Sequence, residues 1–330
     1  MAAPIEVSGS ETEAHPEDLL KGVSGKAIEG RSLGQIAWLR LKRDKVALGG
    51  GVVVLLLIVI AIVGPWFLQD PLKLNQDLID TTLQRPKDGF LHSGISKDHW
   101  FGVEPTYGAD LLARIVKGAR VSLLVAFLAT ILSVVIGSVL GGLAGYFGGW
   151  IDTLIARAMD VFLAFPLLLF AIALVGVVPD EVLGLKQNGL RIWVLIFVIG
   201  FFNWPYVGRI IRGQALSLRE REFVDASRAL GAGHFHIFFR EILPNLFGPI
   251  LVYSTLLIPT NILFEAALSF LGVGIIPPEP SWGNMLTLAV PTYQSTPFYM
   301  VVPGMAIFIT VMAFNLLGDG LRDALDPRAR

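Results

Sequence analysis

The chain has 330 residues, of which 54% are hydrophobic and 16% are charged, and it contains no cysteine. Its mean hydropathy of +0.65 is typical of an integral membrane protein. The net charge of -1 gives no support for a nucleic-acid partner, and the absence of thiols excludes disulfides and thiolate chemistry.

Six apolar runs are each long enough to cross a bilayer, because a helix needs about 20 residues to span a hydrocarbon core about 30 Å thick. The first run follows 45 residues and lacks a small-x-small cleavage site, so it is predicted to be an uncleaved span. We therefore predict an all-α polytopic membrane protein whose six-helix transmembrane domain occupies residues 46–330. The six predicted transmembrane helices are Val46–Leu68, Val121–Tyr146, Leu154–Val178, Ile192–Ile211, Leu246–Val273 and Met300–Leu317.

The residues before the first run fall into two parts. Residues 1–30 are rich in Glu, Gly, Ser and Pro and are predicted to form a disordered acidic cytoplasmic tail. In residues 31–45, Leu33, Ile36 and Leu41 recur at helical spacing opposite Lys42. This pattern predicts an interfacial amphipathic helix in the headgroup layer. A solvated basic flank that only sets the orientation is the alternative.

The distribution of Lys and Arg near the span ends predicts the orientation, because these residues are enriched on the cytoplasmic side. Basic residues are dense in 40–45 and in the loop 214–245, whereas the loop Gly274–Phe298 has no Lys or Arg. The loop 69–120 carries basic residues balanced by acids, but long loops weigh less in this rule. We therefore predict that both termini are cytoplasmic and that 69–120 is an outer loop.

The end of the outer loop carries an apolar stripe over residues 111–116 opposite basic residues, which predicts a helix lying on the outer surface before the second span. His92 and His99 lie in irregular sequence with no partner at metal-ligand spacing. His234 and His236 are two residues apart, so on a helix they point to different faces. No metal site is expected.

Glycine and proline are concentrated in the second and third spans. Pro166 is expected to kink the third span, because proline removes a helical hydrogen bond. Arg157 and Asp160, at i and i+3, are expected to pair near the interface. Overlapping small-xxx-small patterns predict a close approach of the second span to another helix. They are formed by Gly137, Ser138, Gly141, Gly142 and Gly145.

Glu265 is the one acid well inside an apolar run, where a charge costs about 2.5–3.5 kcal/mol on insertion scales. Two interpretations remain open: a residue that lines a pathway through the membrane, or a packing contact with an amide such as Asn261 or Asn315. The segment 275–286 contains three prolines and is predicted to be an irregular outer cap, with Trp282 at the membrane interface.

Several catalytic motifs are absent from the sequence. A P-loop requires Gly, four residues and then Gly-Lys-Ser/Thr, and the nearest match has Leu20 and Ala27 at two of these positions. The motifs H-E-x-x-H and G-x-S-x-G are also missing. Asp160 and Asp319 each have an arginine three residues away and are discounted as an aspartyl protease pair. We predict no enzyme activity, no cofactor and no nucleotide site of the chain's own.

The loop 214–245 carries charges of both signs between two spans and has a helical pattern. Leu216, Phe223, Ala226, Leu230 and Ile237 are predicted to share an apolar stripe. Glycines at 231 and 233 are expected to end a first helix, and the proline at 244 a second one. Two short helices joined by a glycine turn would project into the cytoplasm for a partner to bind. The alternative is a helical hairpin that only connects two spans.

This loop resembles the EAA loop of permease subunits of ATP-binding-cassette importers, whose pattern is Glu-Ala-Ala, three residues, Gly and a later Leu-Pro. Glu241 stands where that pattern has an aliphatic residue. Residues 144–166, 212–232, 265–286 and 313–328 resemble the second permease subunit of dipeptide, oligopeptide and nickel importers. The outer loop is similar too, but has Val103 and Glu104 in place of Thr and Asp. The residues that match the loop pattern are Asp225, Ala226, Ser227, Gly231, Leu243 and Pro244.

The resemblance implies a type I importer permease in the bacterial plasma membrane, with di- or oligopeptides as cargo and nickel or another small solute as the alternative. It implies a second permease subunit, two ATPase subunits that bind ATP-Mg, an extracytoplasmic substrate-binding protein and membrane lipid as partners. An ion-coupled secondary transporter that uses Glu265 is a separate alternative. The residues implied to couple the chain to an ATPase are Arg221, Glu222, Asp225, Ala226, Ser227, Leu230 and Gly231.

Overall fold

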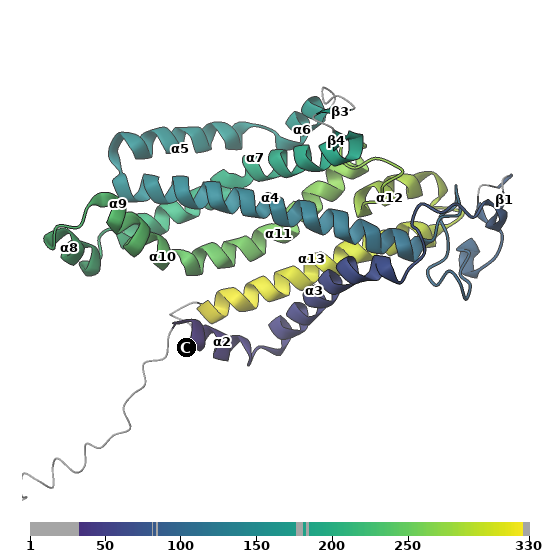
Figure 1. Ribbon diagram of the computed structural model, residues 1–330, viewed down its shortest axis with the longest axis horizontal. Helices are drawn as coiled ribbons and strands as arrows, with labels where there is room; N and C mark the ends of the chain where they lie inside the picture. The colour runs from purple at the N-terminus through teal and green to yellow at the C-terminus, as the bar shows by residue number, and fades with distance from the viewer. Residues whose placement is uncertain (1–32, 81, 84, 176–180, 183–184, 326–330) are drawn as a thin grey trace, which may run out of the picture.

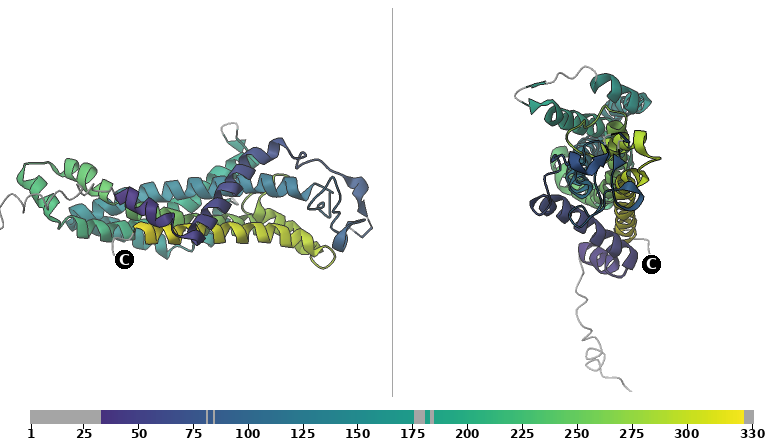
Figure 2. Two further views of the ribbon diagram at one scale, coloured as in Figure 1. Left: turned by 90° about the horizontal axis from the view of Figure 1, so that it is seen from below. Right: turned by 90° about the vertical axis from the view of Figure 1, so that its right-hand side faces the viewer.

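The computed structural model describes residues 33–325 except 81, 84, 176–180 and 183–184. The predicted tail of residues 1–30 lies outside the described residues. Long helices run side by side along the longest axis of the molecule, with the outer loop at one end and α8 (Glu222–Ala229) at the other (Figure 1). Figure 2 shows the same arrangement from two further directions.

Five helices among the described residues are long and apolar enough to cross a membrane, and a bent pair of helices makes six when it is counted as one span. The bent pair is α5 (Gly149–Ala164) and α6 (Leu167–Val175), which differ in direction by 75°. The predicted all-α fold with six spans is therefore confirmed, with the bend at Pro166. The other spans are α3 (Lys45–Val63), continued by η1 (Gly64–Trp66), α4 (Leu111–Phe147), α7 (Gln187–Leu218), α11 (Phe247–Phe270) and α13 (Pro297–Leu325).

The remaining elements are short. In the outer loop, η2 (Gln76–Leu78) and η3 (Phe90–His92) flank the antiparallel pair β1 (Ile79–Asp80) and β2 (Arg85–Pro86). A second antiparallel pair, β3 (Glu181–Val182) and β4 (Leu185–Lys186), precedes α7. The other short elements are α2 (Leu33–Leu41), α9 (His234–His236), the π-helical turn η4 (Ile237–Ile242), α10 (Leu243–Asn245), α12 (Trp282–Ala289) and η5 (Val290–Thr292).

Helix α2 lies beside the C-terminal part of α13 (Figure 1). Its buried residues Ala37 and Leu41 pack against Leu321 and Ala324. Asp44 then accepts hydrogen bonds from the first backbone N–H groups of α3 and begins that helix. Part of the predicted amphipathic face of α2 is thus covered by protein, and its place in the headgroup layer stays a prediction.

The prediction of a separate surface helix before the second span is wrong, because α4 runs without interruption from Leu111. The carboxylate of Asp110 accepts a hydrogen bond of 2.7 Å from the Ala113 N–H and caps the helix. The stripe over residues 111–116 is buried, and Trp282 donates its indole N–H to the Ile115 carbonyl at 3.1 Å. Trp282 is 1% exposed, so its predicted place at the membrane interface is also wrong.

The small residues of α4 lie against α7, as the small-xxx-small patterns predict. A Cβ added to Gly137 would lie 2.7 Å from the Trp204 carbonyl oxygen, and one added to Gly141 would collide with the backbone of Gly208. Side chains at these positions would force the two backbones apart. We call this contact the α4–α7 seam; it makes these two helices the most closely joined pair in the bundle.

Candidate functional site: the coupling loop and the space between α7 and α11

Helix α8 begins and ends at residues with non-helical backbone. Arg221 is extended, with φ -89° and ψ 147°, and its carbonyl accepts from the Val224 N–H at 2.9 Å. Gly231 has φ +83°, and its N–H donates to the Arg228 carbonyl at 2.9 Å. A positive φ after a helix favours glycine, because a side chain there meets the neighbouring carbonyl. The helix therefore ends at the glycine turn that the sequence predicts.

The buried side of α8 differs from the predicted stripe. Val224 is fully buried against Ile237 and Phe238 of the π-helical turn, and Phe223 is half-buried. Ala226 is exposed and Leu230 is 88% exposed, whereas Ile237 is fully buried, so the prediction that these residues share one stripe is wrong. Of the residues that match the importer pattern, Asp225, Ala226, Gly231 and Pro244 are exposed, whereas Ser227 and Leu243 are half-buried.

The second half of the loop is fixed to the end of α4. Phe238 is fully buried, and a Cβ added to Gly142 would lie 3.1 Å from its ring. Tyr146 and the Nδ1 atom of His234 are hydrogen-bonded at 3.1 Å. Pro244 does not end the helical path, because α10 contains it and α11 begins two residues later. The chain thus passes from the glycine turn into α11 by almost continuous helix.

Two ion pairs join the bent third span to α7. Arg209 donates to Asp160 at 2.6 Å, and the predicted pair of Arg157 with Asp160 is also present, at 3.8 Å, with Arg157 mostly exposed. Arg212 makes two hydrogen bonds to Asp152, of which the Nη2–Oδ2 bond is 2.7 Å. Sequence reasoning missed both interhelical pairs, because residues about 50 to 60 positions apart give no periodic signal.

Glu265 is fully buried in α11. Its Oε1 atom accepts from the Ser269 hydroxyl at 2.7 Å, and that hydroxyl also accepts from the Ile275 N–H at 3.0 Å. The predicted contact with Asn261 is wrong, because Asn261 accepts from Asn203 and donates to Thr130, each at 2.9 Å. The carboxylate therefore connects α11 to the start of the outer cap.

The outer loop is held to α4 by buried charges. His99 Nδ1 lies 2.7 Å from Asp110, and Arg114 lies 3.5 Å from the fully buried Glu104. Burial raises the pKa of the Glu104 carboxyl, and the neighbouring Arg114 partly opposes that effect. Among the described residues, no three His, Asp or Glu side chains gather closely enough to hold a metal ion.

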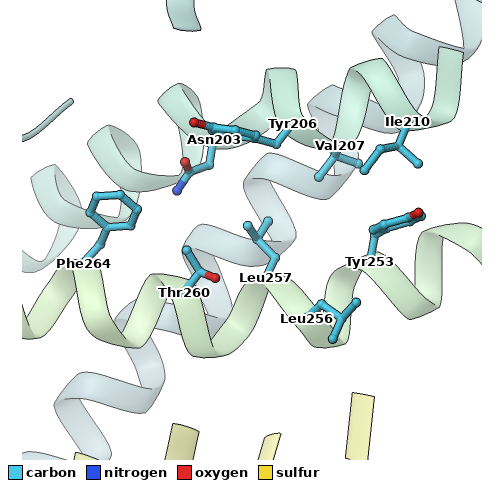
Figure 3. Close-up of a pocket in the computed structure, with 9 residues that line it drawn as sticks. All are labelled: Asn203, Tyr206, Val207, Ile210, Tyr253, Leu256, Leu257, Thr260 and Phe264. Carbon is cyan, nitrogen blue, oxygen red and sulfur yellow. The ribbon is translucent and has the colours of Figure 1, made fainter. Parts of the chain in front are cut away.

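A pocket of about 380 Å³ lies between α7 and α11 (Figure 3). Asn203 and Tyr206 border it from α7, and Tyr253, Thr260 and Phe264 border it from α11, together with four aliphatic side chains. Glu265 does not line it. Figure 3 shows Asn203 and Thr260 projecting from the two helices into the space between them.

Comparison with known proteins gives consistent matches. Residues 137–330 match a family described as the binding-protein-dependent transport system inner membrane component, and residues 32–86 match the N-terminal transmembrane domain of oligopeptide transport permease C. The chain is 41% identical to a dipeptide transport system permease protein of Alkalihalophilus pseudofirmus, over 89% of this chain and 90% of that protein. It is 40% identical to a glutathione transport system permease protein of Escherichia coli, with the same coverage. An inward-facing methionine ABC transporter structure matches with a TM-score of 0.50 and 19% identity, over 64% of this chain and 96% of that chain, which supports the fold alone.

Proposed function

Because the chain belongs to the family of binding-protein-dependent transport system inner membrane components, we propose that α8 and its glycine turn couple it to a partner ATPase. Family membership makes the chain a permease subunit of an ATP-binding-cassette importer, and a peptide cargo fits its relatives. The finer proposal is that ATPase closure moves α8 and thereby the spans on either side of the loop.

One observation carries this proposal: α8 buries Val224 into its own subunit while it exposes Asp225, Ala226 and Leu230 at one end of the molecule. Leu230 alone would be an ordinary surface leucine, but together with Asp225 and Ala226 it forms an exposed surface whose residues match the importer pattern, and this match favours an ATPase as the partner that covers it.

We further propose the surroundings of this subunit. ATP and Mg²⁺ bind to two partner ATPases at the α8 end, which places that end and both termini in the cytoplasm. A second permease subunit completes the translocation pathway, and a substrate-binding protein delivers cargo at the opposite end. The membrane is the bacterial plasma membrane. Glu265 serves as a packing residue, since it is fully buried, accepts a hydrogen bond from Ser269 of its own helix and has Ser122 of α4 and Ser281 of the outer cap as further neighbours.

Cysteine cross-linking tests the coupling proposal, and a chain without native cysteine suits it. Ala226→Cys on α8 is compared with Tyr107→Cys, an exposed residue of the outer loop at the other end. In the complex purified with its native partners, a short bifunctional reagent should join Ala226→Cys, and not Tyr107→Cys, to an ATPase subunit. An ATPase cross-link from Tyr107→Cys, or none from Ala226→Cys, would overturn the proposal.

A further inference from the structure

The pocket between α7 and α11 has a lining that suits one class of ligand. None of its lining residues is charged, and aromatic rings and aliphatic side chains form most of its walls. Its volume of about 380 Å³ lies at the lower end of the range for small-ligand sites, about 300–1,000 Å³. A pocket of this size accommodates a side chain and its adjacent backbone, and not a long folded peptide.

We propose that this pocket transiently binds an uncharged side chain of the cargo peptide, while Asn203 accepts a hydrogen bond from an adjacent peptide N–H. The inference rests on the proposed function, because it requires the space between α7 and α11 to face the translocation pathway. It adds a selectivity step within the membrane to the selectivity of the binding protein.

The amide of Asn203 is held in place by a chain of hydrogen bonds across three helices. Its Nδ2 atom donates to Asn261 on α11, which in turn donates to Thr130 on α4, each at 2.9 Å. The Thr130 hydroxyl donates to the Ala126 carbonyl at 2.8 Å, which completes the chain. These bonds fix the donor end of the Asn203 amide and its orientation.

The acceptor end of the same amide remains available. Within the described part of the chain, the Asn203 oxygen accepts no hydrogen bond, although the residue is only 2% exposed and borders the pocket. A carbonyl oxygen in an apolar site is stabilised by any N–H that reaches it. A peptide backbone supplies such a donor next to each of its side chains.

The same lining disfavours charged side chains. A carboxylate or ammonium group that enters the pocket would lose its hydration and would find no opposite charge there, which is strongly unfavourable. Arg209, next to Ile210 in α7, does not line the pocket and is already paired with Asp160. Peptides with Leu or Phe side chains should therefore use the pocket, and those with Glu or Lys side chains should pass without it.

Two other occupants are open to test. A lipid acyl chain fills apolar space but offers no donor to the Asn203 oxygen. A side chain of the second permease subunit would occupy the pocket permanently and would make it insensitive to cargo. The oxygen of Asn203 therefore favours a peptide over a lipid, and the response of the pocket to cargo distinguishes a peptide from the second permease subunit.

The first experiment measures uptake by the complete importer in vesicles with the tripeptides Ala-Leu-Ala and Ala-Glu-Ala. Thr260→Phe places a ring in the pocket, whereas Leu263→Phe adds the same ring to an exposed position of α11 outside it. Thr260→Phe should lower kcat for Ala-Leu-Ala about tenfold, as pocket changes of this size commonly do. The kcat for Ala-Glu-Ala, and the KM for the loaded binding protein, should change little. Equal loss for both peptides, or no loss, would overturn the inference.

The second experiment identifies the occupant directly. Tyr253→p-benzoylphenylalanine, at the edge of the pocket, is illuminated during transport of radiolabelled Ala-Leu-Ala. Label on this chain that excess unlabelled peptide removes supports the proposal. Cross-links only to the second permease, or only to lipid, refute it. These results are independent of the coupling proposal. If that proposal is wrong, Ala226→Cys forms no cross-link to an ATPase, whereas the peptide uptake and peptide labelling described here are unaffected.

Discussion

Gly231 has a backbone conformation that glycine adopts without strain, and its replacement is expected to uncouple transport from ATP hydrolysis while the protein remains inserted. Its φ is +83°, and an added Cβ would meet no atom within 4 Å. The effect of alanine there therefore comes from the backbone alone. A left-handed conformation costs a residue with a side chain about 1–2 kcal/mol. Proline cannot adopt it, because its ring fixes φ near about -65°.

These energies predict a graded series. For Gly231→Ala, about 1–2 kcal/mol corresponds to roughly a 5–30-fold lower population of the native turn. Gly231→Pro also removes the N–H that donates to the Arg228 carbonyl at 2.9 Å, a loss of about 0.5–1.5 kcal/mol. The native turn must then be replaced by another conformation, and α8 loses its defined position relative to α11. Transport per ATP hydrolysed should fall in the order glycine, alanine, proline.

The assay measures peptide uptake and ATP hydrolysis in the same vesicles, with membrane insertion checked by yield of the assembled complex. Gly233→Ala is the matched control, because Gly233 is exposed, has open space around it and has φ -71° and ψ 156°, which alanine adopts freely. Normal uptake per ATP in Gly231→Pro would refute the reasoning. So would a loss in Gly233→Ala as large as that in Gly231→Ala.

Substitutions at three further buried positions, Glu265, Gly141 and Glu104, test the interior. Glu265→Leu leaves the Ser269 hydroxyl without its acceptor, and thermal unfolding of the complex should show a loss of about 1–3 kcal/mol; intact assembly with altered uptake in Glu265→Gln would instead support a pathway role. Gly141→Val should push apart the α4–α7 seam and destabilise by about 1–3 kcal/mol in the same assay, whereas Gly49→Val, with open space, should not. Burial raises the pKa of Glu104 in the folded protein. The stability that protonated Glu104 contributes is therefore complete below the ordinary Glu pKa of about 4.3, and it is lost as the pH rises through the raised pKa of the folded state. In the wild type, proteolysis of the outer loop should become faster as the pH rises through the pKa of Glu104. In Glu104→Gln the rate of proteolysis should not depend on pH in this way. An equal pH dependence in both proteins would contradict the role of Glu104.

The features set by hydrophobic length and by glycine were predictable from the sequence. A span needs a minimum apolar run whatever surrounds it, so the six runs locate the six spans. Small residues at a spacing of four, such as Gly137 and Gly141, predict a close helix contact because only small residues permit one. Gly231 predicts the end of α8 for a similarly local reason.

Features set by tertiary contacts were not predictable. The stripe at residues 111–116 has the same pattern whether the helix lies on a membrane surface or continues a span. The packing of Trp282 against Ile115 determines that it continues the span. In α8 the inward side is chosen by the π-helical turn that receives Val224, so Leu230 faces outward despite its helical spacing. The partner of Glu265 depends on how the chain returns at Ile275, a turn that periodicity does not describe.

The packing of α4 and α7 limits which helices separate when α8 moves. The α4–α7 seam is close-packed backbone to backbone, so these helices should move as one body. The contact between α7 and α11 is smaller and is made by the Asn203–Asn261 hydrogen bond and by apolar side chains of both helices. Such a bond contributes about 0.5–1.5 kcal/mol, which is small beside the cost of opening a packed seam.

Motion should therefore open the α7–α11 contact and keep the α4–α7 contact. Spin labels on the exposed pair Phe197→Cys and Leu263→Cys report the first distance, and labels on Phe197→Cys and Ile131→Cys report the second. When the partner ATPases bind ATP in the assembled complex, the α7–α11 distance distribution should shift while the α4–α7 distribution stays in place. Equal shifts in both distances would show that the α4–α7 seam opens. The two helices would then not move as one body, and the pocket would have to open in another way.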